Sequence, residues 1–182
     1  MNDREMFEAH KEQIFRLCYC MMQDRSDAED ICQEVFVKAI LADRSQIRDL
    51  RPWLLKIASN ECRKVLKRRK SGLAKEKFAY LLAPPQHGNP VEEGYDRKEK
   101  EDEVNIWLNR LPEKVRVVVV LRFVNELTLR EIAEVIQVPE GTVKSRLNKG
   151  TKLLRRWIDP DIELKPPVKE RKGKWTEFLR VK

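Results

Sequence analysis

Two short helical patterns joined by a tight turn, between positions 128 and 157, restrict the fold more than any other feature. Thr128 followed by Glu131 matches a capping box, and apolar residues then repeat at helical spacing to Ile136. After a turn over 137–141, a second helix carries apolar residues spaced alternately by four and three. The pattern predicts a helix-turn-helix, although a helical hairpin packed for stability alone gives the same spacing. The inward positions of its second helix are Val143, Leu147, Gly150, Leu154 and Trp157.

The opposite face of this second helix is polar and basic. A recognition helix reads base edges in the major groove with its N-terminal residues, so this face is a candidate for DNA contacts. Lys149 could donate to the two acceptors of a guanine, whereas the other cations could equally hold phosphates. The outward residues are Gly141, Ser145, Asn148, Lys149 and Lys152, with Thr142, Lys144 and Arg146 on the flanks.

The segment 115–123, upstream of this motif, is rich in β-branched residues, and propensity alone predicts a strand. Pro112 followed by Glu113 favours the start of a helix instead. We predict a helix, because three helices complete a helix-turn-helix core and a lone strand has nothing to pair with.

The first part of the chain also repeats apolar residues at helical spacing. Helices are predicted over 7–21, over 28–42 with Ser26 or Asp27 as N-cap, and over 52–70, where the initial proline suits a first helical turn. The second of these helices has a polar face opposite its apolar stripe. From the residues alone, a solvated acidic face is the simpler interpretation of that surface, which holds Asp30, Gln33 and Glu34.

The third of these helices carries a polar, mostly cationic stripe. Its segment 60–70 holds six cations and one acid. Such a stripe can contact several phosphates, an Asn amide can pair with a base edge, and a Trp face can stack on a base. A solubilising helix face with a buried Trp explains the same pattern, but the excess of cations favours nucleic acid. The stripe consists of Lys56, Asn60, Arg63, Lys64 and Lys67, with Trp53 near its start.

The distribution of charge divides the chain into parts. The net charge of +8 points to a polyanionic partner, and the cations concentrate in 60–70 and 105–158. Between them, 71–104 holds eight acids, five cations and several Pro and Gly residues, which is typical of a linker. We therefore expect an all-α protein of two small helical domains, 1–70 and 105–158, joined by a flexible linker. The basic tail 159–182 is interpreted as a disordered phosphate-binding arm or as a segment that packs Trp175 and Phe178 on a partner.

Several classes of protein are not expected. The apolar runs are too short to cross a bilayer and the N-terminus lacks the pattern of a signal peptide, so we expect a cytoplasmic protein without membrane insertion. No nucleophile, phosphate loop or zinc spacing is evident, so we expect no catalytic site, metal or cofactor. The four cysteines are interpreted as reduced core thiols; a redox or metal role for Cys18 and Cys20 would require them to share a helix face.

Four segments together resemble bacterial RNA polymerase sigma factors of the small extracytoplasmic-function (ECF, group 4) type of the sigma-70 family. They are similar, in order, to regions two and four of that family, over residues 1–158 and not over the tail. The resemblance implies a promoter-specificity subunit with no catalytic activity of its own. The segments are DAEDICQEVFVKAI (27–40), RPWLLKIASNECRKVLKRRK (51–70), LNRLPEKVRVVVVLRF (108–123) and TLREIAEVIQVPEGTVKSRLNKGTKLLR (128–155).

The resemblance also implies partners and residue roles. The first domain would bind the coiled coil on the clamp of core RNA polymerase, and the cationic stripe would hold the promoter minus-ten element, with a base flipped near Asn60 and the loop 43–50. Region four would read the minus-thirty-five element, and a cognate anti-sigma factor is implied as well. The implied residues are Asp30, Gln33, Glu34 and Phe36 for the polymerase; Trp53, Lys56, Asn60, Arg63, Lys64 and Lys67 for the minus-ten element; and Glu140, Gly141, Thr142, Lys144, Ser145, Arg146 and Lys149 for the minus-thirty-five element.

One departure from the family and two rival functions stay open at this point. The family usually has Ala-Arg-Ala-Arg where this chain has residues 148–151, Asn-Lys-Gly-Thr, so the base preference is not predicted and Gly150 weakens the helix by about 1 kcal/mol. A free-standing helix-turn-helix regulator would bind duplex without polymerase and would not need the acidic face of the second helix. An adaptor that only docks to polymerase would show no promoter preference.

Overall fold

The computed structural model describes the backbone of residues 2–80 and 99–158 and the side chains of residues 2–71 and 105–157. Every regular element in these ranges is a helix, which confirms the expected all-α fold. The first bundle consists of α1 (Asp3–Met22), α2 (Arg25–Leu41) and α3 (Leu50–Tyr80). The second module consists of α4 (Glu99–Arg110), α5 (Glu113–Phe123), α6 (Leu129–Ile136) and α7 (Glu140–Ile158). No helix in the described ranges is both long and apolar enough to span a membrane.

Side-chain caps define where the first helices begin. Asn2 and Glu5 form a capping box at the start of α1. The N-cap of α2 is Asp24, whose carboxylate accepts a hydrogen bond of 2.8 Å from the backbone N–H of Asp27. The prediction of Ser26 or Asp27 as N-cap is therefore wrong by two or three residues: both lie inside the first turn, because the earlier Asp24 already satisfies an exposed N–H group.

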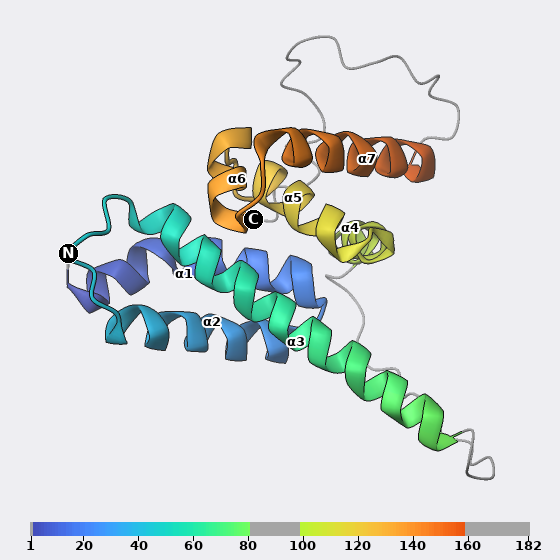
Figure 1. Cartoon of the computed structure of the whole chain (residues 1–182), viewed down its shortest axis with the longest axis horizontal. Coiled ribbons are helices and arrows are strands. Elements are labelled where there is room, and N and C mark those ends of the chain that lie inside the picture. Colours follow the sequence, from blue (N-terminus) through green and yellow to red (C-terminus); the bar gives the residue numbers. More distant parts are fainter. Residues whose placement is uncertain (1, 81–98, 159–182) are drawn as a thin grey trace.

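Two helices extend into the segment that was predicted to be a linker. α3 continues to Tyr80 and α4 begins at Glu99, so residues 71–80 and 99–104 are helical. In Figure 1 the C-terminal part of α3 projects beyond the other helices of the first bundle. The predictions for residues 81–98 and for the tail 159–182 fall outside the described residues.

The first bundle closes over an apolar interior built from α1, α2 and the N-terminal half of α3. Ile14, Leu17 and Leu54 are fully buried within it. Phe7, the first apolar residue of the helix predicted over 7–21, is 39% exposed, and the neighbouring Met6 takes the inward position instead. Phe7 lies at the rim and contacts the edge of the Phe36 ring, with ring centroids 4.9 Å apart.

α5 confirms the prediction of a helix for the valine-rich segment. Its residues 115–121 are buried on every side of the helix. Valine has a helix propensity only a few tenths of a kcal/mol below that of better formers, whereas full burial of its side chain contributes about 1.5 kcal/mol or more. Burial on all faces therefore decides the conformation here, and a helix that is apolar all round must have neighbours on more than one side.

Those neighbours come from both parts of the chain. α6 and α7 pack on α5, while α1 packs on another face of α5 and α3 packs on α6. Figure 1 shows α5 and α6 lying between the first bundle and α7, so α7 is on the far side of the second module. The sequence predicted two domains joined by a flexible linker; in the structure the helices of the two domains pack against each other.

Candidate nucleic-acid interface

The acidic face of α2 is open to solvent. Asp30, Gln33 and Glu34 are exposed, as their helical positions predict. Phe36 differs, since it is only 4% exposed and contacts Phe7 at the edge of the core. The direct polymerase contact implied for Phe36 is therefore not available in this conformation. Its side chain instead supports the packing of α2 on α1.

Three exposed apolar residues on α2, Val37, Ile40 and Leu41, were missed from the sequence, and two of them continue its acidic face. Val37 is 49% exposed and Leu41 is 81% exposed. They lie seven and eleven residues after Asp30, and this spacing places them on the same helix face as Glu34. The face thus combines carboxylates at one end with apolar side chains at the other, a combination suited to a protein partner. The spacing from Asp30 was the signal that could have revealed them. We call Asp30, Gln33, Glu34, Val37 and Leu41 the α2 face.

The cationic stripe of α3 is partly ordered by contacts within it. Lys64 and Lys67 are exposed, whereas Lys56, Asn60 and Arg63 are half-buried. Arg63 donates from Nη2 to Asn60 Oδ1 over 2.6 Å and from Nε to the Ser59 carbonyl over 3.3 Å. Because its oxygen is occupied, the Asn60 amide has its Nδ2 donors left for a base edge. Trp53 is half-buried and packs against the core, which leaves only part of its ring for stacking.

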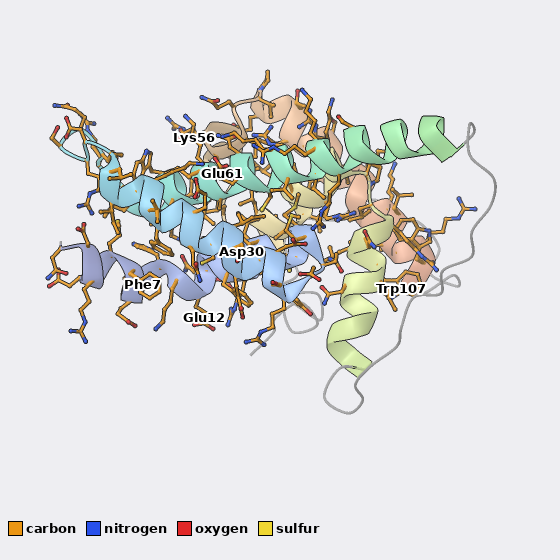
Figure 2. All side chains as sticks on the ribbon, turned by 90° about the horizontal axis from the view of Figure 1, so that it is seen from below. Phe7, Glu12, Asp30, Lys56, Glu61 and Trp107 are labelled. Carbon is orange, nitrogen blue, oxygen red and sulfur yellow. The ribbon has the colours of Figure 1, made fainter. Side chains whose placement is uncertain are left out.

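A chain of ion pairs connects the α2 face with the cationic stripe. Glu61 accepts from Lys64 at 2.8 Å and from Lys38 at 2.9 Å, and Lys38 also contacts Glu34 at 2.8 Å. Burial alone would raise the pKa of Glu61, but the bonds from Lys64 and Lys38 outweigh burial and hold that pKa below its ordinary value. Figure 2 shows Glu61 and Lys56 on α3 and Asp30 on α2. Sequence reasoning missed Lys38 and Glu61, because their contact joins two different helices.

α7, the second helix of the helix-turn-helix, presents its predicted face to solvent. Val143, Gly150 and Leu154 are buried, and Leu147 and Trp157 are half-buried, as expected for the inward side. Since α7 packs on α5 and α6, on the side away from the first bundle, its outward face is not covered by that bundle. The predicted residues Glu140, Gly141, Lys144, Ser145 and Lys149 are exposed, and Thr142 and Arg146 are half-buried.

The glycine at position 150 is explained by its packing, which the sequence did not reveal. A Cβ at this position would lie 2.5 Å from Val119 Cγ2 and 2.9 Å from Val115 Cγ1. α7 therefore approaches α5 more closely than a residue with a side chain would permit. The departure from the family pattern at position 150 is tied to the valine-rich surface of α5.

The loop 42–49 between α2 and α3 is attached to the start of α1. Arg44 forms an ion pair with Asp3, and its Nη1 lies 3.3 Å from Met6 Sδ. Within the loop, Asp43 accepts from the Ser45 backbone N–H over 2.9 Å, and Asp49 accepts from that of Arg51 over 3.0 Å. These bonds give the segment predicted to shape the base pocket a defined conformation.

All four cysteines are buried thiols without a disulfide. Burial raises the pKa of Cys20 to about 12 and that of Cys32 to about 11. A hydrogen bond with the Cys62 thiol, and then burial, raises the pKa of Cys18. The Cys18 thiol thus lies beside that of Cys62 on α3. Among the described residues no cluster of three or more His, Cys, Asp or Glu side chains is arranged to hold a metal ion.

Fold and surfaces together define a two-module helical DNA-binding protein. The family models for sigma-70 region 2 and sigma-70 region 4 match residues 6–72 and 108–154. The chain is 30% identical over 168 residues to the ECF RNA polymerase sigma factor SigW of Bacillus subtilis (strain 168), covering 85% of this chain and 87% of SigW. It is 29% identical over 157 residues to the ECF RNA polymerase sigma factor SigE of Mycolicibacterium smegmatis, covering 85% of this chain and 60% of SigE.

Two solved structures share the fold. One is the sigma factor RpoE in complex with the anti-sigma factor NepR from Bartonella quintana, with a TM-score of 0.66, 20% identity, and coverage of 87% of this chain and 98% of that one. The other is CnrH in complex with the cytosolic domain of CnrY, with a TM-score of 0.63, 21% identity, and coverage of 88% and 89%. The chain belongs to the ECF RNA polymerase sigma factors of the sigma-70 family.

Proposed function

We propose that this sigma factor uses three separate surfaces to direct core RNA polymerase to promoters. The α2 face binds the polymerase, the α3 stripe with Trp53 holds the minus-ten element, and the outward face of α7 reads the minus-thirty-five element. The observation that carries this proposal is the exposed mixed acidic and apolar α2 face, present beside two cationic surfaces. A free-standing helix-turn-helix regulator has no use for such a face.

The role proposed for each surface is supported by the chemistry of its residues. Lys64, Lys67 and Arg63 supply positive charge for the DNA backbone, and the Asn60 amide supplies donors to a base edge. On α7, Lys149 lies one helical turn after Ser145 on the exposed side, where a major-groove base contact is geometrically accessible. The α2 face carries no cation at its five positions, which disfavours DNA and favours a basic protein surface there.

The proposed role with core polymerase also implies where this chain works in the cell and how it is regulated. A subunit that acts with polymerase on chromosomal promoters works in the cytoplasm. We also infer a cognate anti-sigma factor, because one of the solved structures described above holds a sigma factor bound to an anti-sigma factor. Such a protein is expected to suppress transcription directed by this chain.

Reconstituted run-off transcription with bacterial core polymerase, across a randomised promoter library, tests the function. The wild-type chain is expected to select templates with two conserved elements. Asn60→Ala is expected to lose specific initiation while polymerase binding persists, and Asp30→Lys to lose polymerase binding itself. Glu12→Lys, an exposed reversal on α1, and Lys114→Ala, an exposed change on α5, serve as matched controls and are expected to behave as wild type.

Two outcomes would contradict the proposal. The first is tight, sequence-specific duplex binding by the chain alone together with no initiation when polymerase is present, which describes the free-standing regulator. The second is initiation that does not change with Asn60→Ala and Asp30→Lys, which would remove the assigned surfaces from the mechanism.

A further inference from the structure

Asn60 and Arg63 form a bonded pair on the polar side of α3. Arg63 donates from Nη2 to Asn60 Oδ1 over 2.6 Å and from Nε to the Ser59 carbonyl over 3.3 Å. Two bonds from one planar guanidinium fix its orientation as well as its position. Both bonds lie within about one turn of the helix, so the pair needs no other element to form.

The other charged residues of the stripe do not compete for this pair. Glu61, the acid between the two, accepts from two lysines, at 2.8 Å and 2.9 Å. In the part of the chain that the structure describes, no carboxylate forms an ion pair with Arg63. Lys64 and Lys67 are exposed, whereas Asn60 and Arg63 are half-buried. The stripe therefore divides into exposed lysines, which suit phosphates, and a half-buried pair, which suits a base.

The bond to Arg63 determines which way the Asn60 amide faces. The last torsion of an asparagine side chain is broad and roughly two-fold, so a free amide can exchange its oxygen for its nitrogen by a half turn. Arg63 has donors and no acceptor, so it can bind only the oxygen. A half turn would place the donors of Asn60 against those of Arg63. The pair therefore leaves Nδ2 as the free end of the amide.

A fixed amide restricts the choice of base. A free asparagine reads adenine with both ends, since its amide donates to N7 and accepts from the N6 amino group. Here Oδ1 already accepts from a cation, and the amino group of adenine would approach N–H groups of Arg63 on that side. A base edge with acceptors alone, such as O6 and N7 of guanine, meets donors from both side chains. The pair is thus expected to disfavour adenine.

We propose that Arg63 is a positioning residue for base selection: by holding the Asn60 oxygen, it directs the amide donors to the minus-ten strand and rejects adenine at the position that Asn60 contacts. This role adds to the positive charge that Arg63 contributes along the stripe. The inference rests on the proposed function, because it requires that α3 holds the minus-ten element.

Run-off transcription by reconstituted holoenzyme, from barcoded promoters randomised across the minus-ten element, tests the positioning role. The barcodes of the transcripts give the base preference at each position. Templates retained by the holoenzyme are sequenced in parallel, so a variant that binds but initiates poorly still reports its preference. Asn60→Asp identifies the contacted position, because a carboxylate accepts and cannot donate, and the preference there is expected to change to a base with an amino group.

Arg63→Met removes the guanidinium and keeps an unbranched side chain with good helix propensity. We expect adenine at the identified position to rise about tenfold relative to the preferred base, since a bidentate base contact discriminates by roughly that factor or more. The double variant shows whether Arg63 acts through Asn60. A carboxylate has two equivalent oxygens and no orientation to fix, so adding Arg63→Met to Asn60→Asp is expected to leave the base preference as Asn60→Asp alone sets it.

Two further variants separate the effect on base choice from the loss of a charge. Lys67→Met removes an exposed cation of the same stripe, and is expected to lower the salt slope of promoter binding by about one unit without altering base preference. Arg4→Met makes the same change from arginine at an exposed site on α1 and is expected to behave as wild type. Circular dichroism and polymerase binding check that each variant folds.

Three results would overturn the positioning role. The first is a wild-type chain that selects adenine at the identified position. The second is a folded Arg63→Met that keeps the wild-type base preference, including the case in which only the salt slope falls, as for a phosphate contact. The third is an equal effect of Arg63→Met in the Asn60→Asp background. Each of them leaves the proposed function standing, whereas absence of initiation by the wild-type chain would contradict the proposed function and this inference with it.

Discussion

At the scale of single residues, Gly150 shows how a position that weakens a helix can be required by its neighbours. Glycine inside a helix costs about 1 kcal/mol relative to alanine. Here the cost is offset by close packing, because α7 lies against Val115 and Val119 of α5 where a methyl group would not fit. The sequence reveals the glycine, but only the three-dimensional contact reveals why it is there.

Gly150→Ala is therefore expected to destabilise the second module despite its better helix propensity. β-Branched valines in a helix have one strongly preferred rotamer and cannot turn away easily, so overpacking costs about 1–3 kcal/mol. After the gain in propensity, we expect a net loss of about 1 kcal/mol in the free energy of unfolding, measured by denaturant titration. Gly141→Ala is the matched control, since nothing lies within 4 Å of a Cβ there. Equal or greater stability of Gly150→Ala would show that α7 shifts to accommodate the methyl group.

The burial of Phe36 differs from what the family resemblance implied for this residue. Phe36 lies four residues after Cys32 and next to Val35, and all three side chains are buried. The resemblance to the family implied an exposed contact instead. The spacing from Cys32 was the signal that could have shown the burial of Phe36.

At the scale of elements, α6 depends on its cap. A helix of eight residues is too short to persist by propensity alone, so its ends matter. Glu131 accepts from the Thr128 backbone N–H over 2.7 Å and from the Thr128 hydroxyl over 2.7 Å, while its own N–H donates to that hydroxyl over 3.3 Å. The capping box predicted from the sequence is confirmed, because both of its partners lie within four consecutive residues.

The same cap predicts a dependence of stability on pH. The hydrogen bond from the Thr128 hydroxyl, and then that from its backbone N–H, lowers the pKa of Glu131 below its ordinary value. A carboxyl group whose pKa is lowered by folding stabilises the folded state at pH values above its pKa in the unfolded chain, about 4.3. That stabilisation is lost as the pH falls through the pKa of the folded state. Glu131→Gln keeps the geometry of the box without the charge. We expect it to be less stable than wild type at pH 7, with the difference shrinking toward pH 3 in denaturant titrations. A difference independent of pH would mean that the charge contributes nothing.

The elements divide into those that local sequence determines and those that it does not. The inward and outward faces of α7 were predicted correctly, because periodicity alone decides which side of a helix is apolar. The helical state of α5 was predicted from the need for a third helix, against β propensity. The N-cap of α2 was missed because Asp24, Ser26 and Asp27 are all good caps and lie within four residues.

At the scale of the whole molecule, docking of the two modules was not predicted. The contact between Met21 and Arg116 joins positions 95 residues apart, and no local pattern links them. Two hints were present in the sequence: a helix apolar on every side, and one arginine within its run of valines. A buried arginine needs acceptors, and here one of them belongs to the other module.

The thiols of the first bundle have a practical consequence for the molecule. The four cysteines, on α1, α2 and α3, are buried in its interior, and the pKa values of Cys18, Cys20 and Cys32 are raised. The thiols therefore react slowly with alkylating reagents while the bundle is closed. Iodoacetamide modification, followed by mass spectrometry, is therefore expected to be negligible in buffer and to rise steeply across the denaturant transition. The bundle thus carries natural reporters of its own opening, and its rate of alkylation gives the stability of this bundle without any engineered probe.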